Sequence, residues 1–583
     1  YVNALNDKTF KQNLADAYNS TAYPFPLDAQ PPLNVHWSQI AEWHYDDYDN
    51  IPSLSGLTKD FDATYKTSDY IYTTYNSSPY YAQEPVQSFQ TKGMVTWTRE
   101  LILGSQNYIY SVNIDDDKGR VIQVKTKNFR SGDDLVTAQY NWVGQPLRIV
   151  HKHQMPAVSG TTGQSTVTLT DIRYDDLGRA VQTQKKIQNT LVENNELPGT
   201  WTRISTNIYD ASGQLNKKTM GNKRDADGSY TASILSSQEY VYNVRGWLLS
   251  INKDYTNATT NSDRYFALEL GYDKDPSIGT NNSKQYNGNI GSMLWKSEGD
   301  QHRRKYDFTY DNANRLNAAD FGQYASGSGG SAVFSNGVVD FSEYGIGYDY
   351  NGNIQTLSRK GLKLNSSPVI DQLIYSYYSF DNAPYKVTDG ITSSDNGSLG
   401  DFKDGTGTGG DYNNNNGNGS LTTDFNKGIS SIAYYNTIEL PKTITTDKGT
   451  VGYVYSSGGE KFTKQTIETA ATVAYGGNPY TNISITTTTT YLGGAVYESK
   501  AYTNNSTLNT ALGYTDRLQF IAHEEGRIRP QYNNASTPNT PTGFVYDYFI
   551  KDHLGNTRMV LTDEYKQDIY PAATLEGDIN TDG

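Results

Sequence analysis

The stretch that decides the fold is RYDDLGRAVQTQKK, residues 173–186. Tyr174 closes one strand, and the Asp175 carboxylate can accept hydrogen bonds from backbone N–H groups two residues on. Gly178 supplies the positive φ that a type I turn followed by a bulge requires, and Arg179 opens the return strand. The following AVQTQKK alternates as a strand with one buried face does. The stretch therefore predicts a β-hairpin, and turn and strand geometry explain its residues without a substrate.

The same plan recurs along the chain, which indicates architecture rather than chemistry. Tyr209 follows Tyr174 by 35 residues, a spacing that allows two or more strands in each repeat. Copies with variations are NIDDDKGRVIQVKTK (113–127), IYDASGQLNKKT (208–219), YNVRGWLLSINK (242–253), TYDNANRLNAAD (309–320), GYDYNGNIQTLSRKG (347–361), DYNNNNGNGSLTTD (411–424) and YSSGGEKFTKQ (455–465). The residues expected to build these turns and walls are Tyr174, Asp175, Gly178, Arg179, Tyr209, Asp210, Gly213, Tyr310, Asp311, Arg315, Tyr348 and Asp349.

The composition agrees with a repetitive β protein. Hydrophobic residues make up only 36% of the 583 residues, and the mean hydropathy of -0.69 by itself would suggest disorder. The 49 tyrosines argue against disorder, because they supply ring area that can be buried while the hydroxyls stay solvated. Tyrosine and threonine favour strands, and glycine, asparagine and aspartate favour turns. We therefore predict an all-β fold.

Charge and cysteine content exclude several classes of function. The net charge of -14 disfavours nucleic acid and anionic membrane surfaces as partners. The absence of cysteine excludes disulfides, thiol nucleophiles and thiolate metal sites. No apolar run approaches the length of a membrane span. The chain begins at Tyr1 and ends in GDINTDG, which we interpret as an internal or processed fragment.

The tandem Tyr-Asp-x-x-Gly-Arg turns resemble the YD repeats of the RHS family. The stretch DYFIKDHLGNTRMVLTDEY (547–565) is similar to that family's late core motif, with Asp552, His553, Gly555 and Arg558 at its defining positions. The order of further stretches resembles RHS proteins of Bacteroidota, namely GMVTWTRELILGSQNYIYSVNIDDDKGRVIQ (93–123), YLGGAVYES (491–499) and LQFIAHEEGRIRP (518–530). The resemblance covers roughly residues 93–570.

The resemblance implies a long β-ribbon that spirals into a hollow shell, or cocoon, around a C-terminal cargo that is often a toxin. It also implies a bacterial, exported protein that is extracellular or at the cell surface, with its own cargo, export machinery or secretion-system components as partners. We expect an irregular cap or degenerate repeats over 1–92, with a short helix at 9–18. The repeat shell then covers 93–546, with flexible insertions at 325–337 and 393–420, followed by the core motif at 547–570 and a tail at 571–583.

The chain departs from the family pattern after Asp552-His553. There the family usually continues to a plug, an autocleavage site with paired aspartates and a variable cargo, whereas this chain stops at Gly583 without an Asp-Pro-x-Gly motif. Neither the self-cleaving protease nor a toxin activity is therefore transferred to it. The expected function is a non-enzymatic shell, and the fragment lacks the cargo region. In this motif we expect Leu554 to pack, Gly555 to permit the turn and Arg558 to pair with a carboxylate.

Four motifs suggest chemistry, and each has a plainer structural explanation. GTGTGG (405–410) lacks the strand and helix that a dinucleotide site needs. His151 and His153 share one face of a strand, as many metal ligands do, but lack a convincing third ligand, so a solvated strand is expected. Asp552-His553 has the appearance of a catalytic dyad, yet it fits the structural motif, and no nucleophile elbow accompanies it. YNSSPYY (75–81) holds the densest aromatic patch, and tyrosines at repeat spacing are more often core than ligand platform.

The terminal DINTDG (578–583) matches the first half of a calcium loop, with Asp578, Asn580 and Asp582 as ligands. The bidentate acid expected six residues after the glycine is outside the sequence, so a plain acidic tail is the other interpretation. No other cofactor is expected. For the whole chain, two alternatives to the shell stay open. One is a cell-surface adhesin or carbohydrate-binding YD-repeat protein, and the other is a hydrolase, which requires a cleft that joins a histidine to a nucleophile.

Overall fold

The structure is a computed structural model that describes residues 39–158, 162–257, 263–274, 276, 284–362, 366–379, 381–391, 400–405, 409–414, 417–534 and 537–565. Contacts divide the chain into a unit Tyr1–Glu42 and a unit Trp43–Gly583. Apart from the start of β1, every element below belongs to the second unit. The helix expected at 9–18 lies outside the described residues, as does the tail at 571–583.

Strands β1 to β21 form the first sheet. Their bounds are β1 Ala41–Tyr45, β2 Val95–Leu101, β3 Tyr108–Asp115, β4 Val121–Lys127, β5 Asp133–Tyr140, β6 Pro146–Met155, β7 Gln164–Tyr174, β8 Ala180–Asn189, β9 Thr202–Tyr209, β10 Leu215–Arg224, β11 Tyr230–Tyr242, β12 Leu248–Ile251, β13 Phe266–Gly271, β14 Ser292–Ser297, β15 Arg303–Tyr310, β16 Leu316–Ser326, β17 Val333–Ser335, β18 Glu343–Tyr348, β19 Ile354–Lys360, β20 Val369–Tyr377 and β21 Pro384–Asp389.

Strands β22 to β33 form the second sheet. Their bounds are β22 Tyr412–Asn413, β23 Thr423–Asp424, β24 Ile429–Tyr435, β25 Leu440–Thr446, β26 Gly449–Tyr455, β27 Lys461–Tyr475, β28 Asn478–Leu492, β29 Ala495–Tyr502, β30 Tyr514–His523, β31 Gly526–Gln531, β32 Gly543–Lys551 and β33 Thr557–Thr562. The described helices are α2 Ser506–Leu512 and the short 3-10 turns η2 Ser53–Ser55, η3 Ala63–Tyr65, η4 Glu193–Asn195, η5 Lys253–Thr256, η6 Gly329–Ser331 and η7 Phe425–Lys427.

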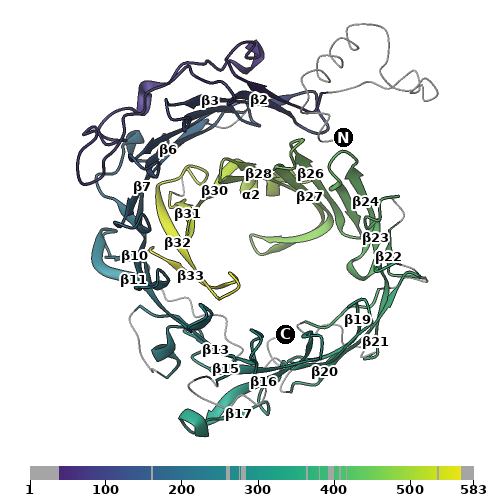
Figure 1. The fold of residues 1–583 in the computed structure, drawn as a ribbon. Helices are drawn as coiled ribbons and strands as arrows, with labels where there is room; N and C mark the ends of the chain where they lie inside the picture. Colours follow the sequence, from purple (N-terminus) through teal and green to yellow (C-terminus); the bar gives the residue numbers. More distant parts are fainter. Residues whose placement is uncertain are drawn as a thin grey trace, which may run out of the picture. The chain divides into compact units, whose positions relative to one another are not determined.

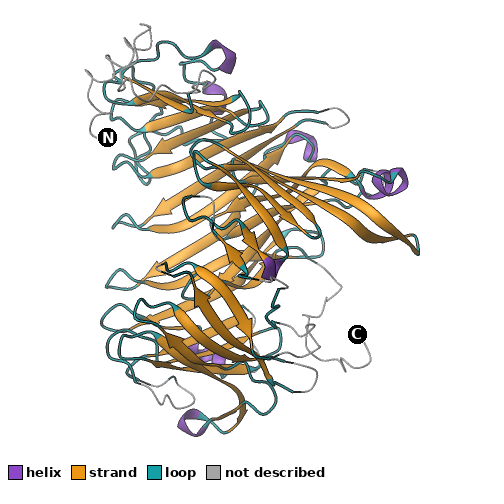
Figure 2. Cartoon of the chain, turned by 90° about the vertical axis from the view of Figure 1, so that its right-hand side faces the viewer, coloured by secondary structure: helices purple, strands orange, loops and turns teal. Residues whose placement is uncertain are grey.

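Both sheets are antiparallel meanders, in which a strand pairs with its neighbours in the chain. A local exception is β16, which pairs with both β17 and β18. Figure 1 shows the strands of the first sheet following one another along an arc, and strands dominate the regular structure in Figure 2. The Asp411 N–H donates to the Tyr385 carbonyl at 2.9 Å where one sheet leads into the other. The predicted all-β class is confirmed.

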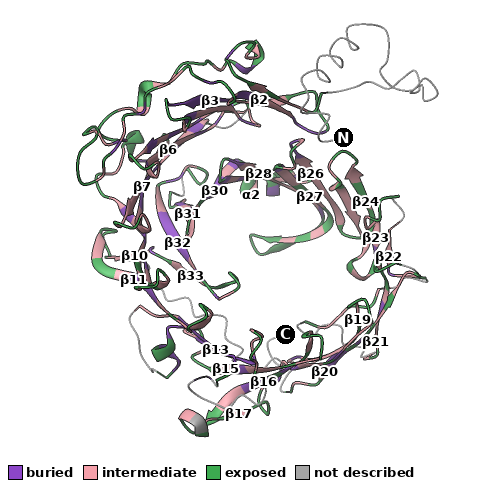
Figure 3. Ribbon diagram, viewed as in Figure 1, coloured by how far each residue is buried: buried purple, intermediate pink, exposed green. Residues whose placement is uncertain are grey.

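The largest core lies between the two sheets. On the first sheet it is built by residues of β8 to β13, among them Ile204 and Met220. On the second sheet it is built by residues of β28 to β32, among them Tyr497, Ile528 and Tyr548. Figure 3 shows buried residues along β32, on the inner side of the arc. Strands β8 to β13 of the first sheet therefore pack face to face with β28 to β32 of the second.

The opposite face of the first sheet is covered by chain that precedes or connects its strands. Tyr48 packs with Trp97 and Ile114 over β2 and β3, and Tyr65 and Trp201 pack against the residues that β6 and β7 direct to this side. Burial on both faces of these strands orders a chain of low hydrophobicity, because each tyrosine ring adds to the buried area. The contact division falls at Glu42, so residues 43–92 belong to the same unit as the predicted repeats.

Two expected insertions differ in how much of them the structure describes. Residues 325–337 contain the end of β16, η6 and β17, so part of this segment is an added hairpin rather than a loop without structure. In 393–420, residues 393–399, 406–408 and 415–416 lie outside the described residues, and β22 forms within the remainder.

Candidate functional site: the turn ladder and the interface between the sheets

The hairpin at Asp175 supports its own turn through one carboxylate. Asp175 Oδ1 accepts from the N–H groups of Leu177 at 3.0 Å and Arg179 at 2.9 Å, and Arg179 Nε donates to Oδ2 at 2.8 Å. Gly178 has φ +78°, the left-handed conformation that glycine adopts without a steric penalty. The hydrogen bonds from Arg179 lower the pKa of Asp175, because they favour its charged form.

Successive turns are joined by a contact between arginine and tyrosine, which we call the turn ladder. The Arg179 guanidinium lies 4.7 Å from the Tyr209 ring centre, and the Tyr209 hydroxyl donates to the Ala180 carbonyl at 3.0 Å. Arg315 and Tyr348 repeat both contacts, with 4.5 Å to the ring centre and a hydroxyl hydrogen bond of 2.7 Å to the Leu316 carbonyl. Each rung fastens one hairpin to the next along an edge of the sheet.

The other predicted turn residues occupy equivalent positions, with substitutions that keep the geometry. The Asp210 carboxylate accepts from the N–H groups of Ser212 and Gln214, and Gly213 has φ +87°. The Asp311 turn has no glycine, and Asn314 adopts φ +63° in its place. Asparagine is one of the few other residues that tolerates this region. Tyr174, Tyr310 and Asp349 form the corresponding hydroxyl or carboxylate hydrogen bonds.

The late motif at 547–565 contains a turn of the same kind. Asp552 Oδ1 accepts from the N–H groups of Leu554 and Asn556, each at 2.9 Å, and Arg558 Nε donates to Oδ2 at 2.8 Å. Gly555 has φ +84°. The expectation that Leu554 packs is wrong, because its side chain is 75% exposed at the tip of the turn. Burial lowers the pKa of the adjacent His553.

Among the described residues, four of the ion pairs that join the two sheets share one polarity. In each pair the cation belongs to the first sheet or its loops and the anion to the second sheet or its turns. The pairs are Arg130–Asp516 at 2.6 Å, Lys185–Glu524 at 3.0 Å, Lys218–Glu525 at 2.5 Å and Arg224–Asp563 at 3.0 Å. Because the cations lie on one sheet and the anions on the other, the two facing surfaces attract each other electrostatically.

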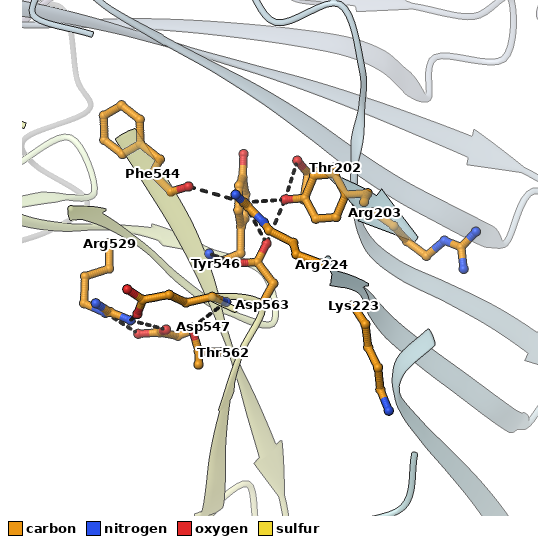
Figure 4. A network of polar contacts seen from close by, with 12 residues as sticks. Thr202, Arg203, Lys223, Arg224, Arg529, Phe544, Tyr546, Asp547, Thr562 and Asp563 are labelled. Carbon is orange, nitrogen blue, oxygen red and sulfur yellow. Dashed lines mark hydrogen bonds and ion pairs between the residues drawn. The ribbon is translucent and has the colours of Figure 1, made fainter. Parts of the chain in front are cut away.

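Asp563 is the most enclosed anion of the four, and Figure 4 shows its surroundings. Its side chain is 0% exposed, and Oδ2 accepts from Arg224 at 3.0 Å and from the Tyr230 hydroxyl at 2.7 Å. Oδ1 accepts from the Tyr546 N–H at 2.8 Å, and Arg224 also donates to the Phe544 carbonyl at 3.3 Å. Burial raises the pKa of Asp563 despite these partners.

A second acidic group lies beside this network on the same sheet. Arg529 donates to Asp547 at 3.1 and 3.2 Å and to Glu564 at 3.2 Å, and Arg527 donates to Asp547 at 2.9 Å. Desolvation would raise the pKa of Asp547, but the two arginines outweigh it and the pKa is lowered. The residues that follow β33 are thus held by arginines of both sheets.

The two histidines of HKH do not lie on a solvated strand, so that expectation is wrong. His153 is only 4% exposed, its Nδ1 lies 3.0 Å from Asp134 Oδ1, and its ring packs 5.7 Å from that of Tyr497 on the second sheet. His151 faces Gly493 in the turn between β28 and β29. Burial lowers the pKa of His151 to about 4, because the charged imidazolium would lose its solvation between the sheets.

A cavity of 340 Å³ separates the sheets beside these histidines. Its lining includes His151 from the first sheet and Glu460 and Phe462 from the second. Burial, followed by repulsion from Glu100, raises the pKa of Glu460. No sequence signal pointed to this cavity, since its walls come from strands more than 300 residues apart.

One group of carboxylates among the described residues has a spacing that could hold a metal ion. Asp371, Asp389 and Asp401 place ligand oxygens within 4.8 Å of one another. Asp371 already forms an ion pair with Arg359 and accepts from the Phe402 N–H at 2.7 Å, and Asp389 accepts from the Gln372 N–H at 2.8 Å. These partners explain the group without a cation. The calcium ligands predicted at Asp578, Asn580 and Asp582 lie outside the described residues, as do residues 406–408 of GTGTGG.

Within the described ranges, no helix has the length and apolar character needed to cross a bilayer.

The turn residues can be recognised from a local sequence pattern, whereas the residues of the interface between the sheets cannot. The Asx-x-x-Gly spacing marks a turn locally, whereas Arg224 and Asp563 are 339 residues apart and carry no local pattern. Glu524 and Glu525 belong to the quoted stretch 518–530, where their adjacency is the one feature that could have suggested an ionic contact.

Comparison with known proteins leaves the family open. No family model matches the chain, and no curated protein matches it. Among solved structures, the crystal structure of TcdB2-TccC3-TEV aligns at 13% identity and a TM-score of 0.29, and the match covers 81% of this chain and 24% of that one. A porin-like protein from Bacteroides uniformis aligns at 10% identity and a TM-score of 0.13, over 59% of this chain and 96% of that one. At these scores, the function has to be inferred from the geometry.

Proposed function

We propose that this chain is a non-enzymatic wall of the RHS kind, which encloses or presents a cargo segment of the same polypeptide for export or delivery. The observation that supports this proposal is that the chain after β33 is held between the two sheets, because Asp563 pairs with Arg224 of the first sheet and Glu564 pairs with Arg529 of the second. A segment that continues from this point would start on the face that the second sheet covers, rather than on the outer face. The proposed location is outside the producing cell or at its surface.

The turn ladder supports a structural role. Arg179 forms a hydrogen bond with Asp175 and packs on the Tyr209 ring. Arg315 forms the same two contacts with Asp311 and Tyr348. Side chains engaged in this way stabilise hairpins and are not available to bind and convert a substrate. A repeated internal contact is what a wall of many hairpins needs, because each hairpin alone is marginally stable in water.

The test is protection of the following segment in the full-length gene product. Native protein is treated with a protease of broad specificity, and peptides are identified by mass spectrometry over time. We expect residues beyond 565 to be cleaved much more slowly in the native protein than after unfolding in urea. Cleavage at the same rate in both states would exclude enclosure.

A pair of matched variants makes the test specific. Arg224→Met removes the cation that holds Asp563 and should accelerate cleavage beyond residue 565. Arg179→Met removes a similar guanidinium from the solvent edge and should leave that rate unchanged. Equal rates in the two variants would argue against Asp563 as the anchor.

A further inference from the structure

One turn of the ladder has an aromatic residue in the position of the arginine. At residues 243–247, asparagine and tryptophan stand where the Asp175 turn has aspartate and arginine. Asn243 Oδ1 still accepts from the N–H groups of Arg245 at 2.9 Å and Trp247 at 3.0 Å, and Gly246 has φ +80°. The Trp247 ring takes the place of the guanidinium, 5.2 Å from the ring of Tyr272. The rung is therefore aromatic rather than cationic.

This aromatic rung lines a cavity of 540 Å³. The cavity lies where the β11–β12 turn meets the chain before β14. Its lining includes the rings of Tyr242, Trp247, Tyr272 and Tyr286, and Tyr286 is 68% exposed. Arg245 spans the rim, with its guanidinium 5.0 Å from the Trp247 ring centre and its Nη1 donating to the Tyr286 carbonyl at 3.1 Å.

Polar side chains of both signs share this lining. Lys253, Lys274 and Arg245 supply N–H donors, and Glu269 and Asp273 supply carboxylate acceptors. Glu269 is buried, and its Oε1 accepts from the Thr256 hydroxyl at 3.2 Å. Because the charges nearly balance, the cavity does not favour a strongly anionic or cationic ligand. It offers apolar ring faces together with many hydrogen-bonding groups.

We propose that this cavity binds a saccharide, with the aromatic rings contacting the C–H face of a sugar ring and the charged groups bonding its hydroxyls. Ligand sites combine aromatic lining with a few polar groups in this way, and volumes of roughly 300–1,000 Å³ are typical. A neutral polyhydroxylated ligand matches the mixed charge of the lining better than a phosphate or a peptide of one sign. The site does not depend on a cargo, so it goes beyond the wall function.

The test is binding of defined saccharides to the whole chain. Free hexoses, N-acetylhexosamines and their disaccharides are titrated with saturation-transfer NMR, and the same sugars are presented on an immobilised glycan array. We expect at least one to bind with a Kd below about 10 mM. Binding of free sugar would indicate a soluble ligand, whereas binding of immobilised glycan alone would indicate recognition of a surface. Absence of binding in both formats would overturn the proposal.

Two variants separate the site from the fold. Tyr286→Ala removes an exposed ring and should weaken binding by about 2- to 10-fold with an unchanged Tm, as expected for the loss of one aromatic contact. Tyr350→Ala removes a ring that is 109% exposed at another turn tip and should leave binding unchanged. Equal binding by wild type and Tyr286→Ala would overturn the assignment to this cavity, whatever the array shows.

Discussion

The Asp175–Arg179 pair at the solvent edge and the Asp563–Arg224 pair between the sheets join the same two chemical groups, yet the two carboxyl groups respond in opposite directions. Hydrogen bonds from Arg179 lower the pKa of Asp175, which keeps contact with solvent. Burial raises the pKa of Asp563, although Arg224 and Tyr230 both act to lower it. The comparison shows that the surroundings, rather than the partner, determine what an ion pair does here.

The difference has an energetic consequence. A solvated pair contributes little to stability, because water screens the attraction and the side chains lose conformational freedom. A buried pair also contributes little in total, but the loss of one partner leaves a charge without solvation, which is strongly destabilising. The ladder should therefore tolerate substitution, while the interface should not.

The largest effect expected from a single substitution comes from the removal of Arg224. Arg224→Met leaves the Asp563 carboxylate buried beside the Tyr230 hydroxyl and the Tyr546 N–H alone. We expect the free energy of unfolding to fall by about 3–5 kcal/mol, as for other buried pairs that lose one partner. Urea unfolding followed by tryptophan fluorescence measures it.

The control is the double variant Arg224→Met with Asp563→Asn, which removes both charges. Its loss should be smaller than that of Arg224→Met alone, because no buried charge remains. If the double variant is the less stable of the two, the uncompensated charge is not the cause.

The second effect is acid destabilisation through buried histidines. Burial lowers the pKa of His151 and of His523 to about 4 from the ordinary 6.5. Asp134, His153 and Lys185 act on His151, and Glu524, Lys185 and Asp547 act on His523. Above pH 6.5 both imidazoles are neutral in the folded and unfolded chains. Between pH 6.5 and 4 the unfolded chain binds protons that the folded one does not, so stability should fall by about 2–3 kcal/mol for each histidine.

Thermal unfolding between pH 8 and pH 4 measures this dependence. The variant His151→Gln with His523→Gln should lose most of the slope between pH 6.5 and 4. Carboxylates of lowered pKa, such as Asp547, lose their contribution to folding stability only as the pH falls below 3.8, so they act in a different pH range. Asp563 has the opposite sign, because its raised pKa favours the folded state as the pH falls. Parallel curves for wild type and variant would refute the role of the histidines.

The smallest expected effect is in the ladder, at Gly178. A β-branched residue at φ +78° is strained, and a Cβ there would lie 2.7 Å from Gln145 Nε2. Gly178→Val should therefore lower the free energy of unfolding by roughly 1–2 kcal/mol. Gly178→Asn should cost less, since Asn314 already occupies the equivalent position at φ +63°. Equal Tm values for the two variants would contradict the turn assignment.

Local features of the fold were predictable from the sequence. The strand predicted after Arg179 is β8. The conformation of each turn depends on a few neighbouring residues, because its hydrogen bonds join groups no more than four residues apart. Leu554 was not predictable in the same way, because the exposure of a turn tip depends on what else packs against it.

The sequence by itself determined that this protein is a meander of hairpins, because backbone φ preferences and Asx-turn hydrogen bonds act within a few residues. Tertiary structure alone decided which face of each strand is buried. His151, Arg224 and Asp563 acquire their properties only when β28 to β33 cover the first sheet, since desolvation depends on neighbours hundreds of residues away. The rung at Trp247 differs from the others in lining a cavity, and only the folded chain places Tyr286 and Glu269 around it.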